Sequence, residues 1–198
     1  MVMMMRPPWN RWTVASRGVS SWFDLLAQPG LALALRPDKG VYSDAAAYFT
    51  AANKEYLTVA DNASLSTGDI DFMIGFWMKQ ADVTAAAGIL GKWPGAGNYE
   101  YLFNHEGASS LRFYVSNDGT AQVAVLSGNT FSNDTWYFVL GWHDAAANTI
   151  NIQVNDGTVA TAAHTTGVRD GNGALNIGGN LDVPNYKTVA LDSGQLRK

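Results

Sequence analysis

The fold is decided by the stretch Asp71–Lys79, which reads DFMIGFWMK. Side chains of a β-strand point alternately to its two faces, so this stretch has one apolar face, made of Phe72, Ile74, Phe76 and Met78. A second stretch, Trp136–His143 (WYFVLGWH), is apolar on both faces and therefore predicts a strand in the centre of a sheet. We expect the tryptophans of these stretches to belong to the core: Trp77, Trp136 and Trp142.

Short apolar segments separated by turn residues continue outward from these two stretches. Two Asn-Asp-Gly turns, at residues 117–119 and 155–157, each join a pair of such segments, which is a strong β-hairpin signal. The whole chain reads as about ten to twelve strands with almost no helical periodicity. This pattern predicts an all-β fold, with two antiparallel sheets packed face to face as a sandwich.

The composition agrees with this class and limits the function. The chain has 198 residues, enough for one domain with a sizeable core, and it contains 20 glycines but only 15% charged residues. It has no cysteine, which excludes disulfides, thiolate metal sites and a cysteine nucleophile. The net charge of −4 argues against nucleic-acid and membrane partners, and no apolar run reaches the ~18 residues of a membrane-spanning helix.

Charge is distributed unevenly along the chain. Residues 1–37 contain four arginines and one acidic residue, whereas residues 38–198 contain 9 basic and 16 acidic residues. We expect residues 1–37 to be an N-terminal docking arm and residues 38–198 to form the sandwich. The arm contains the residue types that anchor protein interfaces, namely Trp9, Arg11, Trp12, Trp22 and Phe23.

A series of short sequence words runs in order from about residue 45 to residue 182. The words are Tyr56-Leu57 with Val59, Asp61–Leu65, Gly68-Asp69, Asp71-Phe72, Phe76-Trp77, Ile89–Trp93, Leu111–Phe113, Trp136–Phe138, Trp142–Asp144 and Leu175–Gly178. In order and spacing they resemble the laminin G-like domains of the concanavalin A-like lectin/glucanase superfamily. The resemblance implies a two-sheet jelly roll that binds glycans or protein surfaces, sometimes with calcium at the sandwich edge. Related modules occur in extracellular proteins, sugar-processing enzymes and phage tail or capsid-surface proteins.

The C-terminal segment departs from the family pattern. Such domains usually close with a strand that reads roughly Gly-x-Ile-Asp-x-Val and returns beside the first strand. Here the corresponding segment is Tyr186–Leu191, followed by Asp192. Either this segment supplies the final strand, or a sheet edge stays open for the arm of the same chain or of a neighbour to cover.

We do not expect an enzyme. Glycosidases of this fold carry Glu-x-Asp-x-Glu on one strand, a triplet that is missing here, and Glu100 and Glu106 read as carboxylates of turns and solvated faces. The chain also lacks the Gly-x-Ser-x-Gly elbow and the His-Glu-x-x-His metal motif. His105, His143 and His164 therefore read as structural or surface residues.

The glycine-rich segment Pro94–Gly97 marks the best candidate for a glycan site. Modules of this kind bind sugars with exposed aromatic rings and with hydrogen bonds from Asn, Asp and Arg, and loops carry function more often than strands do. The candidate residues around this segment are Trp93, Asn98, Tyr99 and Tyr101. The alternative for Trp93 is a core residue that ends its strand.

Calcium is the one cofactor that the sequence leaves open. It needs about six to eight oxygen ligands, usually from loops. Candidate ligands at expected strand ends are Asp61, Asn62, Asp69, Asn180 and Asp182. Asp and Asn are also ordinary turn residues, so this signal is weak.

Two functions compete at this point. The first is a non-catalytic structural or decoration module of a larger assembly, such as a phage capsid or tail, which binds protein partners or itself and, in addition, glycans. The second is a free glycan-binding module of the lectin type, assisted by calcium. The arm, the short final strand and the lack of a recognisable secretion signal favour the first. They predict synthesis in the cytoplasm and a place on a virion surface, with an extracellular location as the alternative.

Overall fold

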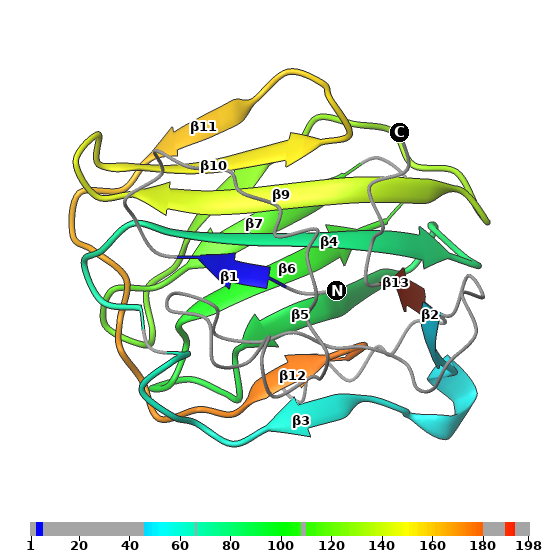
Figure 1. Cartoon of the computed structure of the whole chain (residues 1–198), viewed down its shortest axis with the longest axis horizontal. Helices are drawn as coiled ribbons and strands as arrows, with labels where there is room; N and C mark the ends of the chain where they lie inside the picture. Colours follow the sequence, from blue (N-terminus) through cyan, green and yellow to red (C-terminus); the bar gives the residue numbers. More distant parts are fainter. Residues whose placement is uncertain (1–2, 6–45, 66, 108–109, 180–188, 193–198) are drawn as a thin grey trace, which may run out of the picture.

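The computed structural model describes residues 3–5, 46–65, 67–107, 110–179 and 189–192. These residues form two antiparallel sheets that lie face to face (Figure 1). Sheet A has the strand order β11-β10-β9-β4-β13-β2, with β1 also paired to β4, and sheet B has the order β3-β12-β5-β6-β7-β8. The prediction of an all-β sandwich is therefore confirmed.

The strands are short and lie between the turn residues of the sequence. Sheet A consists of β1 (Met3–Met5), β2 (Ala46–Phe49), β4 (Phe72–Gln80), β9 (Trp136–Asp144), β10 (Thr149–Val154), β11 (Ala160–Ala163) and β13 (Val189–Asp192). Sheet B consists of β3 (Leu57–Val59), β5 (Ala86–Lys92), β6 (Tyr101–Glu106), β7 (Leu111–Val115), β8 (Val123–Leu126) and β12 (Leu175–Ile177). One short 3-10 helix, Ala51–Asn53, follows β2. Both predicted hairpins are present, as the antiparallel pairs β7–β8 and β10–β11.

The core lies between the two sheets, and the alternation in β4 builds one side of it. Its inward residues Phe72, Ile74, Phe76 and Met78 are each at most 1% exposed. Strand β9 lies between β4 and β10, which confirms its predicted central position. On the opposite sheet Phe103 and Phe113 stack with ring centroids 4.7 Å apart.

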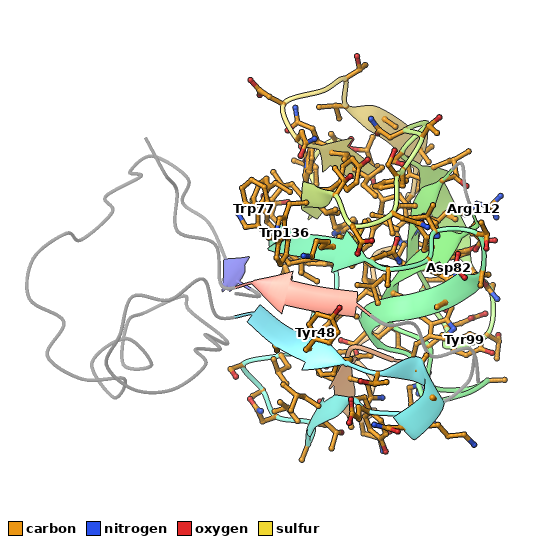
Figure 2. The ribbon with its side chains drawn as sticks, turned by 90° about the vertical axis from the view of Figure 1, so that its right-hand side faces the viewer. Tyr48, Trp77, Asp82, Tyr99, Arg112 and Trp136 are labelled. Atoms are coloured by element: carbon orange, nitrogen blue, oxygen red, sulfur yellow. The ribbon has the colours of Figure 1, made fainter. Side chains whose placement is uncertain are left out.

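The prediction that Trp77, Trp136 and Trp142 belong to the core is wrong. In the register of β4 with β9, Trp77 is paired with Phe138 and Met73 with Trp142, on the face of sheet A that turns away from sheet B. Figure 2 shows Trp77 and Trp136 projecting from that face. For Trp136 and Trp142 the cause is that β9 is apolar on both faces, so its period does not tell which face meets the other sheet. Trp77 lies on the face of β4 opposite to its predicted apolar face.

The open question at the C-terminus is also answered. Strand β13 pairs with β2 on one side and with residues 77–80 of β4 on the other, so part of the segment Tyr186–Leu191 supplies the final strand. Along the same edge of β4, β1 pairs with residues 73–75. Three residues expected in the arm thus continue the edge that the short β13 leaves uncovered. The boundary at residue 37 and the arm residues Trp9, Arg11, Trp12, Trp22 and Phe23 lie outside the described residues.

The close approach of Gly141 to the aromatic pair of sheet B gives a test of this packing. A Cβ atom at Gly141 would lie 2.4 Å from Cζ of Phe103. We expect Gly141→Ala to lower the free energy of unfolding by about 1–3 kcal/mol, because the ring must leave its position in a close-packed core. Chemical denaturation measures this change.

Gly75→Ala is the matched control, because Gly75 lies on the neighbouring strand and faces away from the core. A Cβ there would meet the flexible end of Leu140 at 3.2 Å. We expect a change of less than about 1 kcal/mol in either direction. Equal losses in both variants would contradict the packing described.

Candidate functional site

A buried lysine organises one end of the sandwich. Lys92 is the last residue of β5, and its side chain is 0% exposed. Its ammonium Nζ lies 2.7 Å from Oδ1 of Asp61, 2.8 Å from Oε2 of Glu100 and 3.2 Å from the carbonyl oxygen of Gly171. These three acceptors match the three N–H bonds of an ammonium group, which satisfies a charge that is removed from water.

Glu100 completes this arrangement from the other side. Its side chain is 0% exposed, Oε1 accepts a hydrogen bond from the hydroxyl of Thr67 at 2.9 Å, and Oε2 accepts one from the Gly171 amide at 3.1 Å. Burial raises the pKa of Glu100 above its usual value, although the hydrogen bond and the charge of Lys92 act in the opposite direction. The expectation of a turn or surface carboxylate is wrong for this residue, because both of its oxygens hold other segments in place.

Hydrogen bonds join the neighbouring loops into one unit. The amides of Gly97 and Tyr99 both donate to the carbonyl of Gly119, at 2.7 and 3.2 Å. Arg169 donates from its amide to the carbonyl of Ser116 at 2.7 Å and from Nη1 to the carbonyl of Asp118 at 2.9 Å. The loop after β5, the β7–β8 turn and the loop after β11 are therefore fixed relative to one another.

An open depression of about 510 Å³ lies over this unit. Its wall is formed by Asp61, Ala63, Asn98, Arg169, Asp170, Gly171 and Asn172. Most of these are carboxylate, amide or guanidinium side chains, which donate and accept hydrogen bonds at a fixed spacing. We call this feature the loop depression.

An aromatic stack lies next to the loop depression. Trp93 stacks on Tyr99 with ring centroids 4.2 Å apart and an interplanar angle of 8°, and Tyr114 lies 6.0 Å from Trp93. Trp93 is only 3% exposed and Tyr101 only 1%. The alternative in which Trp93 is a core residue is therefore confirmed, and the expectation of an exposed ring is wrong for Tyr101. Asn98 and Tyr99 are partly exposed. Glycan binding by these residues stays a prediction.

A polar network covers the outer face of sheet B beyond the stack. Oε1 of Glu106 accepts hydrogen bonds from Tyr114 and from Nδ2 of Asn104, both at 2.7 Å, and Nη1 of Arg112 donates to the hydroxyl of Tyr114 at 3.2 Å. Burial alone would raise the pKa of Glu106. The hydrogen bonds from Tyr114 and Asn104 and the charge of Arg112 together outweigh burial, so the pKa lies below its usual value. The carboxylate therefore stays ionised at neutral pH.

The predicted calcium ligands in the described part of the chain are held in other contacts. Oδ1 of Asp61 accepts from Lys92, and Oδ1 of Asn62 accepts from the amide of Ser64 at 3.0 Å. Asp69 packs against Gly167, and Asn180 and Asp182 lie outside the described residues. No three His, Asp or Glu side chains gather as a metal site within the described ranges. Calcium binding stays a prediction.

The sequence predicted that the three histidines are structural or surface residues, and the structure shows that they are structural. His105, His143 and His164 are at most 3% exposed. Nδ1 of His143 lies 2.8 Å from the carbonyl oxygen of Ile70, and Nε2 of His164 is hydrogen-bonded with the carbonyl of Gly167. The rings of His143 and His164 are 5.6 Å apart. These contacts hold the loop that carries Arg169 against sheet A.

Sequence reasoning missed most of the loop depression. It singled out Asp61 as a calcium ligand and Asn98 as a residue of the glycan site. It did not single out Lys92 or the segment 169–172. The only available signal was the polar, glycine-rich composition of residues 168–173 (VRDGNG) between two expected strands. The composition of this segment does not reveal the contacts, distant in sequence, that fix its position.

Comparison with known proteins agrees with the architecture. The family model described as the concanavalin A-like lectin/glucanases superfamily, of the laminin G type, matches residues 51–195. The chain belongs to this family. This match confirms the family that the sequence resembles. A comparison with curated proteins found no match.

Several solved structures show the same fold at low identity. The binding domain of Paraclostridial Mosquitocidal Protein 1 matches with a TM-score of 0.59 and 13% identity, over 73% of this chain and 38% of that one. Domains LG4-5 of the mouse laminin alpha1 chain match with a TM-score of 0.53 and 14% identity, over 69% and 37%. The CBM40 of the Ruminococcus gnavus IT-sialidase, bound to alpha2,3 sialyllactose, matches with a TM-score of 0.50 and 13% identity, over 68% and 79%.

The chain spans little more than a third of the first two of these structures. At these identities the matches establish the fold of this laminin G-like chain and nothing about its ligand. Within the described residues, no helix has the length and apolar character needed to cross a membrane.

The buried ion pair gives a prediction about stability. Glu100→Gln leaves the Lys92 ammonium buried with one carboxylate fewer, so we expect the free energy of unfolding to fall by about 3–5 kcal/mol. Urea denaturation followed by intrinsic fluorescence measures this loss. Asp156→Asn is the control, since Asp156 is exposed in a turn and this change should alter stability little. A Glu100→Gln variant as stable as its parent would contradict the role of the pair.

The histidine pair gives a prediction about pH. Burial lowers the pKa of His164 below 6.5, with a smaller contribution in the same direction from His143. Below its usual pKa the unfolded chain binds this proton and the folded chain resists it, so stability must fall as the pH decreases from 6.5 through the folded pKa. We expect denaturation curves between pH 7.5 and pH 5 (a range about the usual histidine pKa) to show this loss, and His164→Gln to show less of it. The same pH slope in both proteins would contradict it.

Proposed function

We propose that this laminin G-like chain is a non-catalytic binding module that takes a glycan in the loop depression. The observation that carries the proposal is the wall of the depression, where Asp61, Asn98, Asp170 and Asn172 gather from three segments of the chain. Carboxylate and amide groups at fixed spacing accept and donate the paired hydrogen bonds that neighbouring sugar hydroxyls offer. The buried Lys92–Glu100 pair supports the proposal, because it makes the floor rigid before any ligand arrives.

The contacts of the glutamates support a binding role rather than hydrolysis. A glycosidase needs two carboxyl groups that can reach the scissile bond. Glu100 is enclosed with both oxygens bonded to Lys92, Thr67 and Gly171, and Glu106 is held by Tyr114 and Asn104. Neither is placed to protonate a leaving group.

A second candidate is a decoration subunit of a larger particle, such as the phage virion expected from the sequence. The observation that favours it is β1, where only three residues join the edge of β4 by main-chain pairing. A strand added in this way can also come from a neighbouring chain, which is a common route to assembly. The nature of the particle stays a prediction.

Glycan binding is tested with the full chain on an immobilised oligosaccharide array, followed by titration of the best ligand. Asn98→Ala and Asp170→Ala each remove one polar group from the wall, and we expect each to raise Kd by about tenfold, or 1.4 kcal/mol. The glycan should be recovered intact after the titration, as expected for a module without catalysis.

Asn129→Ala is the control, because Asn129 lies beside Gly157 at the opposite end of the sandwich. It should leave Kd within about twofold of the parent. Array binding that neither wall variant weakens would place the glycan elsewhere, and no binding to any glycan would overturn the proposal.

A further inference from the structure

The two outer surfaces of the sandwich differ in chemistry. Sheet B turns its polar network outward, whereas sheet A turns outward a set that we call the apolar face: Met73, Trp77, Trp136, Phe138, Leu140 and Trp142. Trp77 and Phe138 pack with ring centroids 5.4 Å apart, and Nζ of Lys79 lies 5.4 Å from the ring centroid of Trp136. An antiparallel sheet whose outer side meets water usually alternates to polar residues there. A contiguous apolar surface of this kind marks a site of contact with another polypeptide.

The positions of the two ends of residues 6–45 indicate which polypeptide segment contacts the apolar face. Met5 pairs with Met73 of β4, a residue of the apolar face itself. Ala46 pairs with Asp192, and Asp192 pairs with Trp77. Strands in a sheet lie ~4.8 Å apart, so both ends of this 40-residue segment start within about 10 Å of the apolar face.

The composition of the segment fits such a surface. Among its 40 residues are five aromatic residues and five leucines. The aromatic residues are Trp9, Trp12, Trp22, Phe23 and Tyr42. A segment so rich in large apolar side chains gains free energy by removing them from water, unlike the polar sequences that stay unfolded.

We propose that residues 6–45 dock in cis on the apolar face of sheet A. The covalent attachment at both ends gives the segment an effective concentration in the millimolar range over this surface. A second copy of the chain at micromolar concentration competes poorly against it. Docking in cis covers the face and leaves the loop depression free, so this inference does not rest on the proposed function.

Nuclear magnetic resonance of the full chain tests the proposal. The chain contains no cysteine, so Ser21→Cys gives one attachment point for a nitroxide, next to Trp22 and Phe23. In the ¹⁵N-labelled chain we expect the nitroxide to broaden the indole N–H signals of Trp77 and Trp142. The signal of Trp93, which stacks on Tyr99 at the loop depression, should stay sharp and reports that the sandwich is folded.

A mixture of ¹⁵N chain without nitroxide and ¹⁴N chain with nitroxide separates cis from trans docking. Docking in cis predicts no broadening in this mixture. Broadening of Trp77 and Trp142 in the mixture would overturn the proposal in favour of exchange between copies, as the assembly role requires. Sharp Trp77 and Trp142 signals in both samples would overturn docking on this face altogether.

Limited proteolysis of full-length variants gives an independent measurement. Trypsin can cleave after Arg11, Arg17 and Lys39 in the segment. Trp77→Ser removes an anchor from the apolar face and should raise the initial cleavage rate at these sites by about fivefold or more. Leu126→Ser, an exposed position on sheet B, is the matched control and should leave the rate unchanged. Equal rates in the two variants would contradict the proposal.

Discussion

The loop end of this molecule depends on the burial of one ammonium group. Removing a lysine charge from water costs several kcal/mol, and the loss is offset only when acceptors surround the charge. Here the acceptors come from Asp61 after β3, from Glu100 before β6 and from Gly171 after β11. Because Lys92 is satisfied only when all three are in place, the ion pair couples segments that no continuous strand connects. The depression above it thereby has a rigid floor, while the polar groups of its wall stay at the surface.

The packing of the core imposes a second constraint, of a different kind. Phe103 and Phe113 stack across β6 and β7 and fill the space over β9, which is possible because residue 141 has no side chain. Dispersion contacts of this density hold the sheets together without specifying a ligand. Solved structures share this sandwich at 13% and 14% identity, so the fold does not require one particular set of side chains. The ligand of a member is therefore decided by its loops and outer faces.

The fold could be predicted from the sequence because its determinants are local. The alternation at Phe72, Ile74 and Phe76 and the two Asn-Asp-Gly turns each act within a few residues. The side of sheet A on which Trp142 lies was not predictable in this way, because β9 is apolar on both faces and such a strand fits either orientation. The partners of Lys92 were also inaccessible, since Asp61 and Gly171 lie 31 and 79 residues away in the chain. The burial of Trp93 likewise depends on a loop that brings Tyr99 back onto its ring.

The charges of the loop depression bear on the kind of ligand that the proposed function would involve. The positive charge of Lys92 is enclosed and balanced by Asp61 and Glu100, and Nη1 of Arg169 donates to the carbonyl of Asp118. The carboxylate of Asp170 remains exposed at the wall of the depression, where it repels an anionic ligand and accepts hydrogen bonds from hydroxyl groups. A neutral, hydroxyl-rich sugar suits this wall better than a sugar acid. The likeness to a module bound to sialyllactose is therefore a likeness of the sandwich, because the polar groups that select a ligand lie on loops that the shared fold leaves free to vary.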